Sequence, residues 1–284
     1  MNKFAVGVLF AATLASPLLA HAQVHAEASL TNFSYTLIDL LPDDGITPSL
    51  SIVAPVGYAG GSSVYGSIMQ RRTNEPEFED SRTQITTRYN RNLDVKLGAP
   101  AGAANASVTG SNFGALQFHT NVSTTGAPEA FRSASTYARS EILEFVLSPG
   151  TQVSFFADFN GSATTTEPKG SAYRDLANAE ASFMLRSDGF GYDSTSINLA
   201  ASNLSFADAP PATMSASERM SLTLGNSSAS AAKLHLEIFT GSSLQSAYDA
   251  QAASAVPEPA TTAMLAAGLA LVAGAVRRRK AQDQ

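Results

Sequence analysis

Acidic side chains provide most of the groups in this sequence that could take part in chemistry. Asp39, Asp43 and Asp44 lie close together in one segment, and Asp188 and Asp193 lie close together in another. Carboxylate oxygens are the ligands that Ca²⁺ prefers, but the spacing is not that of a helix-loop-helix calcium loop. Both segments also contain an Asp-Gly pair, which is typical of a turn. We therefore expect the first group to be turn-capping aspartates with a Ca²⁺ site as the alternative, the second pair to be a further Ca²⁺ candidate beside a hairpin turn, and no other cofactor.

No combination of residues typical of a catalytic site is present. The sequence has no cysteine, no G-x-S-x-G nucleophile motif and no H-E-x-x-H zinc motif. Glu141 and Glu144 are close enough in sequence to suggest the carboxylate pair of a glycoside hydrolase, but alternation along a strand would place them on opposite faces. His119 and His235 have no partner at metal-ligand spacing. We therefore expect that the chain is not an enzyme, with a hydrolase as the weakest alternative.

Three different features follow one another from residue 256 onward. A short motif, Val256-Pro257-Glu258-Pro259, is followed by an uncharged apolar run at 260–276 and then by a basic cluster. As a helix, the apolar run would be about 26 Å long, which is at the short end for crossing a hydrocarbon core of ~30 Å. The prolines keep the motif extended and outside the helix, at the outer membrane face, where an enzyme could bind it. The cations that favour a cytoplasmic location for the far end of this helix are Arg277, Arg278, Arg279 and Lys280.

This three-part tail resembles the PEP-CTERM protein-sorting domain of Gram-negative bacteria. The matching residues are Pro257-Glu258-Pro259, the Ala/Leu/Gly-rich run at 260–276 and the basic stop at 277–280. The resemblance implies a substrate of an exosortase-type transpeptidase, exported across the inner membrane, anchored there transiently, and passed to the cell surface or an exopolysaccharide matrix. The segment at 36–50 is similar to the opening segment of exported PEP-CTERM proteins. The alternative is an ordinary membrane anchor that is never cleaved.

The first 22 residues have the features of a secretory signal peptide. A single early lysine precedes an apolar stretch at 4–14, and Ala20 and Ala22 form the small-x-small pattern of a cleavage site. We predict cleavage after Ala22, with Ala26 and Ala28 as alternatives. An uncleaved N-terminal anchor is the other interpretation.

The charge balance limits the partners of the domain between these ends. The 284-residue chain has 18 basic and 24 acidic residues, and five of the basic ones fall in the two predicted end segments. The remaining domain is therefore strongly acidic, so nucleic acid is not an expected partner. Without cysteine there are no disulfides. The domain must be stabilised by its own core, which a chain of this length can form.

Apolar and polar residues alternate over most of the domain, as they do in strands with one buried face. The Gly-rich segment at 55–66, which contains Tyr58 and Tyr65, is predicted to be a loop. The predicted strands are 28–41, 49–53, 82–97, one or two short strands within 106–121, 141–147, 153–159, 177–186, 190–204, 220–224 and 234–238.

Turn signals join several of these strands into predicted hairpins. A type II turn is predicted at Ser148-Pro149-Gly150-Thr151, a second hairpin at Asp188-Gly189, and a last one between 220–224 and 234–238. The clearest single strand is predicted at 82–97, with one buried face, which begins with Ile85, and one wet face. Its wet face offers candidate contacts for an acidic polysaccharide, the alternative being ordinary cross-strand pairs. These cations are Arg82, Arg88 and Lys96.

Together, these patterns predict an all-β fold, an antiparallel β-sandwich or jelly-roll-like domain, flanked by an N-terminal signal helix and a C-terminal transmembrane helix. We expect a non-enzymatic surface or extracellular-matrix protein whose partners are an exosortase-type enzyme, the membrane, and exopolysaccharide. The alternative function is a carbohydrate-binding module, assisted by Ca²⁺, although the lack of tryptophan weakens it. The predicted organisation is a signal peptide at 1–22, the β-domain at 23–247, a linker at 248–256 and the sorting tail at 257–284.

Overall fold

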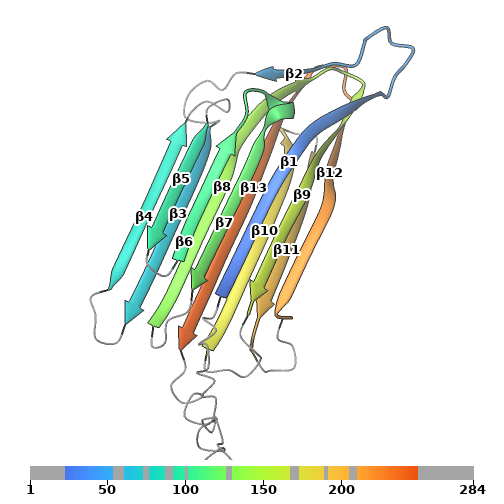
Figure 1. Cartoon of the computed structure of the whole chain (residues 1–284). Coiled ribbons are helices and arrows are strands. Elements are labelled where there is room, and N and C mark those ends of the chain that lie inside the picture. Colours follow the sequence, from blue (N-terminus) through green and yellow to red (C-terminus); the bar gives the residue numbers. More distant parts are fainter. Residues whose placement is uncertain are drawn as a thin grey trace, which may run out of the picture.

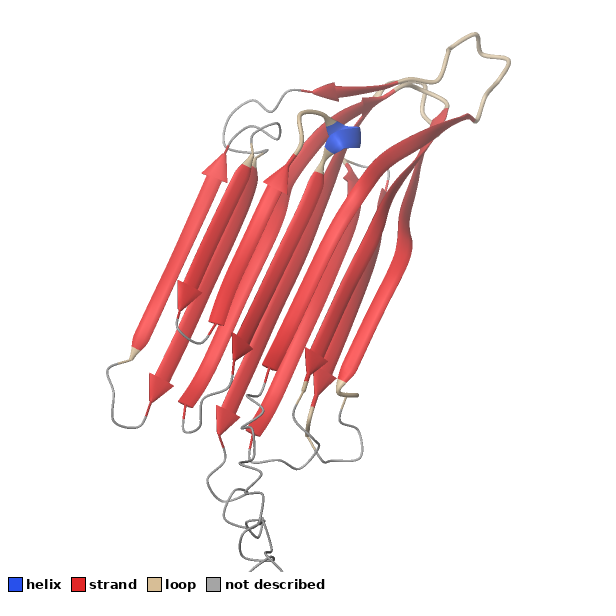
Figure 2. Ribbon diagram, in the orientation of Figure 1, coloured by secondary structure: helices blue, strands red, loops and turns tan. Residues whose placement is uncertain are grey.

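In the computed structural model, the described part of the chain consists almost entirely of strands (Figures 1 and 2). One short 3₁₀ helix, η1 (Phe113–Ala115), is capped by Asn112, whose side chain accepts a hydrogen bond from the backbone N–H of Ala115. The structure describes residues 23–53, 61–72, 77–86, 92–99, 102–125, 130–166, 173–188, 191–204 and 210–248. The strands are β1 (Gln23–Asp39), β2 (Leu50–Val53), β3 (Ser62–Arg72), β4 (Phe78–Thr86), β5 (Leu93–Ala99), β6 (Gly102–Thr109), β7 (Gln117–Thr125), β8 (Ala130–Leu147), β9 (Thr151–Thr165), β10 (Tyr173–Ser187), β11 (Gly191–Ser202), β12 (Thr213–Asn226) and β13 (Ala232–Tyr248).

These strands form two antiparallel sheets that pack face to face. Sheet A has the order β12-β9-β1-β7-β6-β5, and sheet B has the order β11-β10-β13-β8-β3-β4, with β2 paired to one end of β8. Figure 1 shows the long strands of both sheets running in nearly the same direction, as in aligned sheet packing. The predicted all-β, antiparallel, two-layer fold is thus confirmed for the residues that the structure describes. The jelly-roll likeness stays a prediction.

The two predicted terminal helices fall outside the described residues. Within the ranges given above, no helix is both long enough and apolar enough to span a membrane. Figure 1 shows that β1 starts and β13 ends at the bottom of the sandwich, whereas the loop between β1 and β2 lies at the top. β1 and β13 each have 17 residues, so the sandwich is about 55 Å long. The segments before β1 and after β13 therefore attach at one end of an elongated domain.

An apolar core fills the space between the sheets. Along β9, the odd-numbered residues from Val153 to Phe159 are fully buried, while the even-numbered residues lie on the outer face. Phenylalanine rings join the two sheets. The ring centroids of Phe145 on β8 and Phe155 on β9 are 5.1 Å apart, and Phe113 of η1 packs against both rings. Such ring pairs contribute about 0.5–1.5 kcal/mol each beyond their burial. In this strand, the alternation in the sequence identified the buried face correctly.

Two of the three predicted hairpins are instead connections between the sheets. β8 belongs to sheet B and β9 to sheet A, so the turn at Ser148-Pro149-Gly150-Thr151 carries the chain across the core. The turn has the geometry that its sequence predicts, since Gly150 has a φ of +59°. β12 and β13 also lie in different sheets, whereas β10 and β11 do form the predicted hairpin, with Ser187 opposite Gly191. Alternation shows which face of a strand is buried but not which strand it pairs with, so it could not distinguish these cases.

The predicted strand at 82–97 is likewise divided between the sheets. β4 ends at Thr86 on the edge of sheet B, and β5 begins at Leu93 on the edge of sheet A. The prediction that Ile85 faces the core is wrong, because this side chain is 73% exposed. A change of sheet within the segment breaks the alternation that seemed continuous in the sequence.

The candidate polysaccharide contacts therefore do not form one row. Arg82 lies on β4, 3.5 Å from Asp80, and Lys96 lies on β5, 2.8 Å from Asp94. Both cations thus have acidic neighbours on their own strands, rather than the cross-strand partners expected as the alternative to a polysaccharide. Arg88 lies outside the described residues.

At both sides of the sandwich, a side chain connects the edge strands of the two sheets. The N–H of Asp94 on β5 donates to Oε1 of Gln84 on β4 at 3.1 Å. On the other side, the N–H of Thr223 on β12 donates to Oδ2 of Asp193 on β11 at 2.7 Å. Open N–H groups on edge strands can pair with other chains, and these two bonds cover one such group on each side.

Candidate functional site

The residues predicted to direct sorting lie outside the described part of the chain. They comprise the cleavage-site residues Ala20 and Ala22, the motif Val256-Pro257-Glu258-Pro259 and the basic cluster Arg277, Arg278, Arg279 and Lys280. The structure therefore bears on the other candidates, which are the aspartates, the histidines and the outer faces of the sheets.

The first group of aspartates forms turns between β1 and β2. Oδ1 of Asp39 accepts a hydrogen bond from the N–H of Leu41 at 2.9 Å, and Oδ1 of Asp44 accepts one from the N–H of Ile46 at 2.7 Å. These are Asx-turns, in which the side chain takes the place of a backbone acceptor. Asp43 lies between them and is exposed. This geometry supports the turn-capping interpretation.

The second pair of aspartates is engaged by different partners. Asp193 binds the N–H of Thr223 at the sandwich edge, while Oδ2 of Asp188 lies 3.6 Å from Nε2 of His235. Across the described ranges, no three His, Asp or Glu side chains are grouped so that they could hold a metal ion. The Ca²⁺ hypothesis accordingly gains no support from the placement of these residues.

His235 lies between two carboxylates on the outer face of sheet B. Its Nδ1 is 3.7 Å from Oε1 of Glu144, its Nε2 is 3.6 Å from Oδ2 of Asp188, and its side chain is only 12% exposed. Beside it, Arg186 and Glu237 form an ion pair at 3.6 Å. The ring thus lies among β8, β13 and the residue that follows β10, with a carboxylate oxygen near each nitrogen and no hydrogen-bond partner for the buried Nδ1 within the described residues.

β8 contains a bulge between Ser140 and Leu143, so strand alternation does not assign Glu141 and Glu144 to opposite faces. Inward-facing residues of β8 have even numbers up to Ser140 and odd numbers from Leu143, opposite a register shift in β13. Alternation therefore cannot be counted from Glu141 to Glu144. Glu144 is half-buried on the outer face beside His235, whereas the side chain of Glu141 lies outside the described structure.

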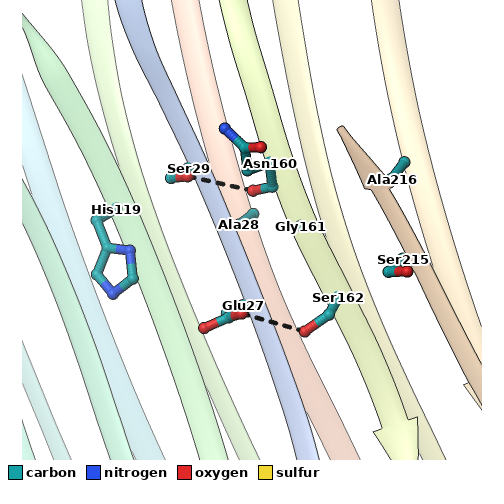
Figure 3. A pocket seen from close by; sticks show the side chains of 9 residues that line it. All are labelled: Glu27, Ala28, Ser29, His119, Asn160, Gly161, Ser162, Ser215 and Ala216. Carbon is teal, nitrogen blue, oxygen red and sulfur yellow. Dashed lines mark hydrogen bonds between the residues drawn. The ribbon is translucent and has the colours of Figure 1, made fainter. Parts of the chain in front are cut away.

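The outer face of sheet A contains a shallow polar groove of about 340 Å³ (Figure 3). Its side chains largely bind one another: Ser162 donates to Oε1 of Glu27 at 3.3 Å, and Ser29 donates to the backbone oxygen of Asn160 at 3.2 Å. Asn160 also accepts a hydrogen bond from Ser217 at 2.7 Å through its side-chain oxygen. Much of the hydrogen-bonding capacity of this groove is thus already used within the sheet.

The outer face of sheet B carries three aromatic side chains on neighbouring strands, Tyr65 of β3, Tyr137 of β8 and Phe239 of β13. We call them the aromatic row. The rings of Tyr65 and Tyr137 are stacked at 5.1 Å with an interplanar angle of 19°, and those of Tyr137 and Phe239 at 6.3 Å and 28°. Phe239 and the carboxylate of Glu180 both lean over Gly241: a Cβ there would lie 2.9 Å from Oε1 of Glu180 and 3.0 Å from two carbons of the Phe239 ring. Gly241 is the residue directly opposite Tyr137.

Most of the aromatic row was not predicted from the sequence. The Gly-rich pattern predicts a loop that includes Tyr65, but this residue lies within β3; Tyr58 is outside the described residues. Tyr137 lies on the same face of its strand as Ser133 and Ser135. A large ring among small polar residues was the one feature of the sequence that could have indicated an aromatic surface there. Phe239 could not be connected with it, because the two residues are far apart in the sequence.

Comparison with known proteins identifies the tail. Residues 255–280 match the model of the PEP-CTERM protein-sorting motif. The chain carries a PEP-CTERM motif. No curated protein and no solved structure matches the chain. The PEP-CTERM motif marks the protein as one that is exported, sorted at the membrane and processed by an exosortase, as in Gram-negative bacteria.

Proposed function

We propose that this protein is a non-enzymatic component of the cell surface or extracellular matrix. The observation that carries the proposal is the PEP-CTERM motif at 255–280, which directs the chain to an exosortase. In this proposal, the predicted helix at 260–276 holds the chain in the membrane until the motif is processed. The elongated β-domain then projects away from the membrane, because the chain enters β1 and leaves β13 at the same end of the sandwich.

The absence of enzymatic activity is part of the proposal. It is supported by the roles of the acidic groups and histidine described above: Asp39 and Asp44 cap turns, Asp193 binds an edge strand, and His235 lies between carboxylates. A catalytic acid or base needs a proton-transfer partner within hydrogen-bond reach of a substrate position. These four side chains are engaged with the protein itself.

Replacing the motif prolines tests the sorting step. We expect Pro257→Ala/Pro259→Ala to leave the protein uncleaved in the membrane fraction, because the stiff, extended motif that the enzyme binds is lost. The matched control is Pro210→Ala/Pro211→Ala in the loop before β12, which should be sorted normally. Cell fractionation combined with the intact mass of the recovered protein measures both outcomes. If a protein that lacks residues 257–280 still reached the same compartment with the same processed mass, sorting by this tail would be refuted.

A carbohydrate-binding module is the second candidate function. The aromatic row favours it, because aromatic rings on a solvent-facing sheet combine a large apolar surface with polar edges. Calorimetric titration with polysaccharides, with and without Ca²⁺, separates this function from a purely structural one. Binding that disappears when Ca²⁺ is chelated would support a role for Ca²⁺. Binding that persists after chelation would refute that role.

A further inference from the structure

A hollow on the outer face of sheet B lies directly beside the aromatic row. It has a volume of about 250 Å³, and we call it the sheet B hollow. Its floor contains Ser67 of β3, Ser135 of β8, Ser243 of β13 and Asn178 of β10. The strand register places these residues opposite one another in a single line across the sheet. With neighbouring strands about 4.8 Å apart, the line is about 14 Å long, which suits a short stretch of an extended polymer.

The polar groups of this floor are available to a ligand. No hydrogen bond joins the side chains of Ser67, Ser135, Ser243 or Asn178 to any other group in the described structure. The groove on sheet A differs in this respect, because Ser29 and Ser162 there already donate hydrogen bonds to neighbours within the sheet. A partner with hydroxyl groups would therefore gain hydrogen bonds in the sheet B hollow without displacing existing ones.

Apolar side chains border the floor on both long sides. On one side lies the aromatic row, since Tyr65 and Tyr137 each stand two positions from a floor serine on the same strand. On the other side lie Phe131 and Leu176 together with the polar residues Ser133 and Gln245. A trough with a polar floor and aromatic rings along one side is complementary to a sugar chain, whose rings present C–H groups on their faces and hydroxyl groups at their edges.

The lining of the hollow also indicates the charge of the ligand. None of its ten lining residues is charged. Recognition of carboxylate or phosphate groups generally uses arginine or lysine at the contact. The floor instead offers hydroxyl and amide groups, which serve equally as donors and acceptors.

We propose that the sheet B hollow binds a neutral polysaccharide, with sugar rings packed against the aromatic row and hydroxyl groups bonded to the serine and asparagine side chains of the floor. The chain of the polysaccharide runs across the strands, from β3 toward β10. This inference rests on the second function proposed above, carbohydrate binding, and it assigns that function a site and a ligand class.

Filling the hollow tests this proposal. Ser243→Tyr places a large ring on the floor at an outward-facing position, and Tyr137→Ser removes the centre of the aromatic row. The matched control is Ser123→Tyr, the same substitution at an outward position on β7 in sheet A. Purified full-length chain in detergent is titrated with soluble neutral glucan, xylan and mannan and with acidic alginate. Far-ultraviolet circular dichroism and thermal melting confirm that each variant is folded.

We expect wild type and Ser123→Tyr to bind at least one neutral polymer equally, and the two hollow variants to bind it at least about tenfold more weakly. Binding to none of the neutral polymers, preferential binding of alginate, or unchanged binding by folded Ser243→Tyr would each overturn the proposal. A change in oligomeric state caused by Ser243→Tyr alone would assign the hollow to self-association and overturn it as well. The assay is independent of cellular location, so failure of the sorting experiment would not affect it.

Discussion

We expect Asn226→Asp to destabilise the domain by about 3 kcal/mol at neutral pH. Asn226 is 1% exposed at the end of β12, and its Nδ2 donates to the backbone oxygens of Leu147, Ser148 and Ser230 at 3.4, 3.1 and 2.8 Å. Its Oδ1 accepts hydrogen bonds from the N–H and hydroxyl of Ser228 at 3.2 and 2.7 Å. One side chain thus connects β12 to the turn by which the chain crosses from sheet B to sheet A.

Aspartate has nearly the same shape as asparagine but replaces the donor with an acceptor. The carbonyl groups then face a carboxylate oxygen, and each buried group left unpaired costs about 1–3 kcal/mol. Two such losses give about 3 kcal/mol, before the cost of burying the charge. Protonation of the new carboxyl would restore one donor, so its pKa in the folded state should be raised. The destabilisation should therefore be smallest at acid pH and grow as the pH rises through that raised pKa.

Urea unfolding, followed by circular dichroism at pH 4 and pH 7, measures this effect. A loss of 3 kcal/mol should lower the unfolding midpoint by about 1 M or more, given the usual dependence of stability on urea. Asn105→Asp is the matched control, because it makes the same change at a half-buried position on the outer face of β6 and should be nearly neutral. If the two variants unfold at the same urea concentration at pH 7, the hydrogen bonds of Asn226 do not stabilise the cross-sheet turn, and the reasoning is refuted.

Two further predictions concern stability. Gly110 has a φ of +120°, and a Cβ there would overlap the backbone oxygen of Ala115; Gly110→Ala should therefore cost about 2 kcal/mol or more. Gly98→Ala, which meets no atom within 4 Å, should be nearly neutral in the same thermal unfolding assay, and equal melting temperatures would contradict the prediction. Burial raises the pKa of Asp175, so the folded state holds its proton more tightly than the unfolded state. Wild type should therefore lose stability relative to Asp175→Asn as the pH rises from about 4 through the raised pKa. Urea unfolding of both proteins at several pH values measures this, and a difference in unfolding free energy that does not change with pH would contradict it.

The strands were predictable where one face is buried and the other is wet. In β9 and β13, the alternation of Phe and Leu with polar residues predicted both the strand and its buried face. The prediction failed in β4, where no row of residues is buried and Ile85 faces solvent. An edge strand with two exposed faces has no burial pattern that could distinguish it from the strand that follows it in the sequence.

The candidate sites divide in a similar way. The aspartates between β1 and β2 were predicted to cap turns, and the Asx-turns of Asp39 and Asp44 agree with that, because such turns are formed by residues close in the sequence. The aromatic row was not predictable, because Tyr65, Tyr137 and Phe239 become neighbours only when β3, β8 and β13 pair. The bulge that shifts the parity of β8 was not visible in the sequence either.

The sequence by itself determined which segments form most of the strands, which side of those strands is buried, and that residues 255–280 carry a sorting motif. These properties depend on residues that are near one another along the chain. Only the tertiary structure decided that the turn after β8 crosses between sheets, and that side chains from four strands meet around one hollow. Strand pairing joins residues that are distant in sequence, and the free energy that selects one pairing comes from packing the whole core.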